Sequence, residues 1–98
     1  MNINEIKTYR LIIKGKVQEV GFRYWFRNLA ISFKLNGYVM NRKKNNEVEI
    51  IVQGNIVDIL SIMEKSKIGP ELAMVEEVIS KQIFNNIQYK EFKVKYQN

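Results

Sequence analysis

The chain has 98 residues, a length that fits one domain, so we expect residues 1–98 to form a single domain. Hydrophobic residues make up 46% and charged residues 27%, which is the mixture of an ordinary globular protein and excludes the disordered class. The formal net charge of +6 favours anionic partners, such as nucleic acid, a membrane surface or a small phosphorylated substrate.

The sequence contains no histidine and no cysteine. It therefore excludes Ser-His and Cys-His nucleophilic machinery as usually built, disulfides, and zinc sites that need either residue. Any catalysis must use carboxylates, amides, basic side chains, backbone groups or the substrate itself, and we expect neither a metal nor a cofactor. The N-terminus lacks the pattern of a signal peptide and no apolar stretch approaches membrane-spanning length, so we expect a cytoplasmic protein.

Alternating apolar residues predict a first strand at residues 8–14. A loop that carries two glycines follows at residues 15–21, and Asn36–Gly37 is expected to end the next helix as a left-handed cap. Between them the apolar residues recur at the spacing of an amphipathic helix, at Phe22, Trp25, Phe26, Leu29, Ala30 and Phe33.

A second strand is predicted at residues 38–41 and a third at residues 47–53, joined by a polar turn at residues 43–46. Asn55 is a good N-cap for a second helix. The predicted apolar stripe of that helix consists of Ile56, Ile59, Leu60 and Met63.

Gly69–Pro70 ends the second helix, and closing strands are predicted at residues 75–83 and 92–96. The order strand, helix, strand, strand, helix, strand predicts an α/β (α+β) sandwich of ferredoxin-like βαββαβ type, with one extra edge strand. In that fold an antiparallel sheet carries both helices on one face. The first and second strands then run parallel with the third between them, so their C-terminal ends share one edge of the sheet.

The loop from Gly15 to Arg23 joins a strand to a helix. A helix start offers unpaired backbone N–H groups and positive partial charge, so a glycine-bearing loop there can gather donors around an anion. Taken alone, the loop is weak evidence and is better explained by a plain connector with two turn glycines. Arg23 supports anion binding because a cation in the first helical turn opposes the helix dipole and suits two-pronged phosphate contact. An arginine that is merely exposed explains it equally well.

At this point the sequence resembles a known family. The loop reads Gly15-Lys16-Val17-Gln18-Glu19-Val20-Gly21-Phe22-Arg23 and is similar to the acylphosphatase signature of the type G-[RK]-V-Q-G-V-G-F-R. The later segment Gly37-Tyr38-Val39-Met40-Asn41 resembles the family's G-W-V-R-N segment. Further blocks follow in the right order, at Val48-Glu49, Gln53-Gly54, Gly69-Pro70, Ala73 and Val75.

The resemblance implies a ferredoxin-like domain that hydrolyses the carboxyl-phosphate bond of small acyl phosphates. It also implies that Arg23 and Asn41 are the catalytic pair, with Arg23 binding phosphate and Asn41 positioning water. Without the resemblance, a hairpin-flanking asparagine that caps its own backbone explains Asn41 better. The implied phosphate-binding loop consists of Lys16, Val17, Gln18, Glu19, Val20, Gly21 and Phe22.

Several positions depart from the family pattern. Glu19 stands where the family usually has glycine, and its carboxylate would repel phosphate or pair with Arg23 unless it points to solvent. A residue other than glycine is also strained there if the backbone needs positive φ. Met40 removes one charge near the site, Tyr38 replaces a tryptophan, and the hairpin carries one more residue than the common form.

Three alternatives stay open. An RNA-binding module is favoured by the basic charge and by the fold class, but the predicted central strands offer only Tyr9 as an aromatic. Glu19 and Met40 also fit a relative that binds anions without turnover. A fragment of a larger hydrogenase-maturation protein is the third alternative, although we expect a stand-alone chain. We expect a monomer, no membrane partner and no nucleic-acid partner.

Overall fold

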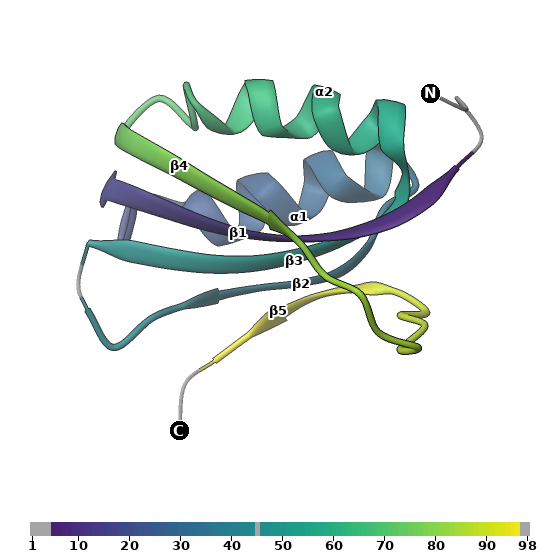
Figure 1. Ribbon diagram of the computed structural model, residues 1–98. Helices are drawn as coiled ribbons and strands as arrows, with labels where there is room; N and C mark the ends of the chain where they lie inside the picture. The colour runs from purple at the N-terminus through teal and green to yellow at the C-terminus, as the bar shows by residue number, and fades with distance from the viewer. Residues whose placement is uncertain (1–4, 45, 97–98) are drawn as a thin grey trace.

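The computed structural model describes residues 5–44 and 46–96, which form one sheet with both helices packed on one of its faces (Figure 1). This is the predicted ferredoxin-like order with one further edge strand, so the predicted fold class is confirmed. The elements are β1 (Ile6–Lys16), α1 (Phe22–Ser32), β2 (Asn36–Asn41), β3 (Glu47–Asn55), α2 (Ile56–Ser66), β4 (Met74–Gln82) and β5 (Phe92–Lys95).

The sheet has the strand order β4-β1-β3-β2-β5. The pairs β4–β1, β1–β3 and β3–β2 are antiparallel, as predicted, but β5 runs parallel to β2 and the whole sheet is therefore mixed. The direction of β5 follows from where β4 ends. Gln82 pairs with Tyr9 near the start of β1, so the chain crosses that end of the sheet and enters β5 beside the start of β2.

The C-terminal ends of β1 and β2 lie at the same edge of the sheet. Ile13 of β1 and Asn41 of β2 both pair with Val48 of β3, so they are level with each other on either side of it. Two strand spacings separate them, roughly 10 Å. Figure 1 shows the connection from β1 to α1 and the turn from β2 to β3 at this same end of the molecule.

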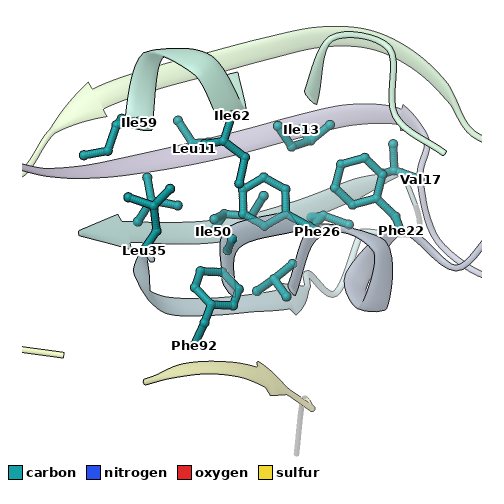
Figure 2. Packing of buried hydrophobic residues seen from close by; sticks show 14 residues of the cluster. Leu11, Ile13, Val17, Phe22, Phe26, Leu35, Ile50, Ile59, Ile62 and Phe92 are labelled. Atoms are coloured by element: carbon teal, nitrogen blue, oxygen red, sulfur yellow. The ribbon is translucent and has the colours of Figure 1, made fainter. Parts of the chain in front are cut away.

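The core lies between the sheet and the two helices. Alternate residues of the two central strands point into it: Leu11 and Ile13 of β1, and Val48, Ile50 and Val52 of β3. Phe26 of α1 stacks at 6.3 Å on Phe22 and contacts Phe92 of β5 at 5.7 Å between ring centroids. Figure 2 shows the cluster, in which Leu11, Ile13, Val17, Phe22, Phe26, Leu35, Ile50, Ile59, Ile62 and Phe92 are labelled.

The end of α1 differs from the prediction. The helix stops at Ser32, and Lys34 takes the left-handed conformation at φ 59° that the sequence analysis assigned to Asn36–Gly37. Two backbone bonds close this end, from Leu35 N–H to the Ala30 carbonyl and from Lys34 N–H to the Ile31 carbonyl, which is the Schellman pattern. Gly37 is needed for another reason: a Cβ there would lie 1.9 Å from the Ile51 carbonyl oxygen on the next strand.

The second helix begins where predicted. The Asn55 side chain accepts a hydrogen bond of 2.9 Å from the Val57 N–H, which confirms its predicted role as the N-cap. The predicted apolar stripe is wrong at Leu60, which is 42% exposed, because the helix turns Ile59 and Ile62 toward the sheet instead. The apolar residues of this helix come in adjacent pairs, such as Ile59–Leu60 and Ile62–Met63, which left the centre of the stripe ambiguous by one position.

Candidate active site

The loop between β1 and α1 is fastened to the turn between β2 and β3. The side-chain amide of Gln18 donates to three carbonyl oxygens of that turn, those of Arg42 at 3.0 Å, Lys44 at 2.7 Å and Glu47 at 2.8 Å. The Gly15 N–H adds a bond of 2.9 Å to the Asn46 carbonyl. The loop and the turn therefore form one connected unit at the edge where β1 and β2 end.

This arrangement changes what Gln18 can do. The family resemblance implied that Gln18 is among the phosphate-binding residues, but its side-chain donor is engaged with the turn. Any contribution of Gln18 to an anion site must therefore come from its backbone. The sequence offers no signal for this role, because the three acceptors lie more than twenty residues away along the chain.

Two apolar side chains anchor the loop at its ends. Val17 and Phe22 are each 1% exposed and point into the core cluster, and Val20 packs against it from the middle of the loop (Figure 2). Of the predicted loop residues, these three can offer only backbone groups to a ligand. Lys16 is exposed and is the loop's own cation.

Glu19 has the positive φ that is expected at a position where the family pattern has glycine. Its φ of 61° is left-handed, a region that costs a residue with a Cβ about 1–2 kcal/mol. Its side chain is exposed, and within residues 5–44 and 46–96 no ion pair joins it to Arg23. The expected backbone strain is therefore present. The expected ion pair between Glu19 and Arg23 is not seen among the described residues.

Arg23 is the second residue of α1. The helix starts after Gly21, whose φ of 77° is also left-handed, and it has neither a side-chain cap nor an acidic residue in its first turn. The Arg23 guanidinium lies over the ring of Tyr96, with 4.8 Å from Cζ to the ring centroid. A cation thus stands at a helix start where the dipole favours an anion.

Asn41 is the last residue of β2, across the shared edge from the loop. It lies two residues after buried Val39, so the two side chains share a face, and Asn41 therefore faces the helix side of the sheet. Its Oδ1 atom is buried, and the described part of the chain supplies it with no hydrogen-bond partner. Buried polar atoms without a partner are rare in proteins, and each one needs a reason.

A buried carboxylate organises the cations around this edge. Glu47 is 4% exposed and lies between two of them, with Lys14 Nζ at 3.7 Å and Arg42 Nη1 at 3.2 Å. Lys43 and Lys44 of the same turn are exposed. The sequence analysis did not single out Glu47, because a glutamate at the start of a strand gives no sign that it will be buried.

The face of the sheet away from the helices carries a separate polar cluster. Tyr38 donates to Glu49 at 2.9 Å, and Arg10 donates to the other carboxylate oxygen at 2.7 Å. Burial and the bond to Glu49 raise the pKa of Tyr38 to about 12. Burial raises the pKa of Glu49, but the bonds from Arg10 and Tyr38 outweigh it and leave the pKa below its ordinary value.

Tyr9, the aromatic that the sequence analysis noted for RNA binding, packs against the core instead. Within the described residues, no three His, Cys, Asp or Glu side chains gather as a metal site would require, and no helix is long and apolar enough to cross a membrane. The predicted lack of a metal and the predicted cytoplasmic location stay predictions.

Comparison with known proteins identifies the family. The family model described as Acylphosphatase matches residues 9–94. An acylphosphatase of Pyrobaculum islandicum is 34% identical over 88 residues, which cover 90% of this chain and 85% of that protein. The crystal structure of an acylphosphatase from Bacillus subtilis superposes with a TM-score of 0.87 at 32% identity, covering 94% of this chain and 100% of that one.

The fold also occurs inside a larger protein. The crystal structure of full-length HypF in its phosphate- and nucleotide-bound form superposes with a TM-score of 0.85 at 29% identity, over 96% of this chain and 12% of that one. The family model and the curated relative both span most of the sequence, and the sheet and helices match the solved acylphosphatase. The chain belongs to the acylphosphatase family of hydrolases.

Proposed function

We propose that this chain hydrolyses the carboxyl-phosphate bond of small acyl phosphates without a metal, giving a carboxylate and phosphate. Arg23 and the backbone amides of residues 16–22 bind the phosphate, and Asn41 positions the water. One observation carries the proposal: the buried Oδ1 of Asn41 has no hydrogen-bond partner among the described residues, at the edge of the sheet that Gln18 fastens to the loop. Family membership supports the activity itself.

The chemistry suits a chain without histidine. The leaving group is a carboxylate, which departs without needing a general acid. Phosphoryl transfer depends on positioning and on stabilising the charge of the equatorial oxygens. Arg23 and the N–H groups at the start of α1 can supply that stabilisation, because the helix dipole and the guanidinium both favour an anion there.

The attack of water on phosphorus needs no group beyond these residues and the substrate itself. Asn41 accepts a hydrogen bond from water through Oδ1 and holds the water oxygen toward phosphorus. The water oxygen forms a bond to phosphorus while the bond from phosphorus to the acyl oxygen breaks. The carboxylate leaves with the electron pair, and the proton of the attacking water passes to the phosphate.

The test is hydrolysis of benzoyl phosphate in EDTA by the wild type, Arg23→Ala and Asn41→Ala. We expect metal-independent turnover, and we expect either substitution to lower kcat/KM by about two to three orders of magnitude. Asn41→Ala should act on kcat with little change in KM, whereas Arg23→Ala should raise KM as well, because of these two side chains only that of Arg23 holds the phosphate in the ground state.

Arg27→Ala is the matched control. Arg27 lies one turn further along α1 and donates to Asn28 at 3.3 Å, so its removal takes away a guanidinium from the same helix. Wild-type turnover that needs an added metal, or an Asn41→Ala variant that is fully active, would contradict the proposal. Phosphate binding without any turnover would favour the non-catalytic anion-binding alternative.

A further inference from the structure

Tyr96 makes two contacts with the first turn of α1. Its ring lies under the Arg23 guanidinium at 4.8 Å, and its hydroxyl shares a hydrogen bond with the hydroxyl of Tyr24. Arg23 and Tyr24 are adjacent in the chain, so one residue of the C-terminal strand region touches both. The bond to Tyr24 raises the pKa of Tyr96 above its ordinary value.

The sheet register explains why Tyr96 reaches this position. β5 runs parallel to β2, and Lys95 pairs with Met40. The next residues along the chain are Asn41, which ends β2, and Tyr96, which directly follows β5, so Tyr96 lies at the edge of the sheet where β2 ends. Alternation along β5 places Tyr96 on the same face as Phe92 and Val94, which is the face that carries α1.

The kind of contact matters for the charge of Arg23. Two other arginines are neutralised by carboxylates, Arg10 by Glu49 at 2.7 Å and Arg42 by Glu47 at 3.2 Å. Arg23 has no ion pair or side-chain hydrogen bond within residues 5–44 and 46–96. An aromatic ring attracts the flat face of a guanidinium, while the N–H donors lie in its plane and stay available at the edges.

We propose that Tyr96 is a positioning residue for Arg23. Its ring holds the guanidinium by the face and directs the N–H edges toward the phosphate without neutralising the charge. Tyr24 keeps the ring in place through the shared hydrogen bond. The inference rests on the proposed function, because it assigns Tyr96 a role only through Arg23.

The test measures KM for benzoyl phosphate and inhibition by inorganic phosphate. Tyr96→Ala should raise KM and the inhibition constant of phosphate together, by about two- to fivefold, the range of an exposed cation–π contact. Tyr96→Phe keeps the ring and should rescue most of this loss. Tyr96 is 60% exposed, so neither change opens a cavity in the core. Lys95→Ala is the matched control, since it removes the contact of Lys95 with the Tyr38 ring at 4.1 Å.

A double-mutant cycle separates positioning from general destabilisation. In an Arg23→Ala background, Tyr96→Ala should cause no further loss of residual kcat/KM, because the group that it positions is gone. An equal loss in both backgrounds, or a Tyr96→Ala variant that binds phosphate like the wild type, would overturn the inference alone. An Arg23→Ala variant with unchanged activity would overturn the proposed function and the inference together.

Discussion

The two helices begin in opposite ways. At α2, the Asn55 side chain caps the Val57 N–H and Asp58 places a negative charge in the first turn, so the chain satisfies its own helix start. At α1, left-handed Gly21 provides no side-chain cap, no acid follows, and Arg23 adds a positive charge. The difference teaches that the chain itself satisfies the start of α2, whereas in the proposed function an external anion takes that part at the start of α1.

The largest expected effect tests whether α1 needs that anion. Inorganic phosphate at ten times its dissociation constant should stabilise the wild type by about 1.4 kcal/mol, roughly 5–10 °C in Tm for a domain of this size. Arg23→Ala should abolish most of this shift along with hydrolysis. Without phosphate its Tm should stay close to that of the wild type, because a lost cation–π contact is offset by a relieved helix dipole. Thermal unfolding with and without phosphate measures both.

A phosphate-induced shift that survives in Arg23→Ala would place the anion elsewhere. A large loss of Tm in phosphate-free buffer would instead show that Arg23 stabilises the fold, which would remove the contrast between the two helix starts.

The second prediction concerns the fastening of the loop in front of α1. Gln18→Ala should lower the free energy of unfolding by about 2 kcal/mol, because three carbonyls lose a side-chain donor and, among the described residues, only those of Lys44 and Glu47 keep a backbone N–H donor. It should also lower kcat/KM by about tenfold, since small displacements in a positioned site are costly. Urea unfolding and benzoyl phosphate kinetics give the two values.

Gln53→Ala is the matched control for Gln18. Gln53 also joins separate segments through its side chain, donating to Thr8 and to the Ile87 carbonyl and accepting from the Tyr89 N–H. It does so at the opposite end of the sheet, so its loss should reduce stability and leave kcat/KM unchanged. Equal kinetic losses in both variants would contradict a specific role for Gln18.

The third prediction tests the start of α2. Asn55→Ala should reduce the free energy of unfolding by about 1 kcal/mol, the usual value of a side-chain N-cap, with unchanged kcat/KM. Denaturant titration of the variant beside the wild type checks the stability, and hydrolysis at substrate concentrations well below KM checks kcat/KM. A kinetic defect would show that the two helix starts are not independent.

The smallest effect concerns the strained loop residue. Glu19→Gly removes the cost of φ 61° and a carboxylate next to the anion loop. Stability should change by less than about 1 kcal/mol, because relief of strain is offset by the flexibility of glycine in the unfolded chain. KM for benzoyl phosphate should fall. An unchanged KM would mean that the carboxylate of Glu19 does not reach the phosphate.

Periodic features of the sequence predicted most of the fold. The alternation in β1 and β3, the spacing of the α1 apolar residues and the Asn55 cap are local patterns, and each appears in the structure. The parallel direction of β5 and the left-handed conformation of Lys34 were not predicted. The first depends on where a long connection crosses the sheet, and the second on which residue the helix reaches when its last turn closes.

The site was less predictable than the fold. Motif positions indicated Arg23 and Asn41, and topology placed the ends of β1 and β2 at one edge. The contacts that organise this edge join distant segments. Gln18 bonds to the β2–β3 turn, Glu47 lies between Lys14 and Arg42, and Tyr96 lies under Arg23. No local pattern marks such contacts, because they depend on the register of strands that are far apart in the sequence.

The parallel edge strand has a consequence for folding. Tyr24 and Tyr96 are 72 positions apart, so their contact forms only after the crossing from β4 to β5 is complete. Contacts of such long range carry a high loop-closure cost and tend to form late. During synthesis, the loop, Arg23 and Asn41 leave the ribosome well before position 96. A growing chain would therefore hold all the groups of the proposed phosphate site while its arginine still lacked the ring beneath it.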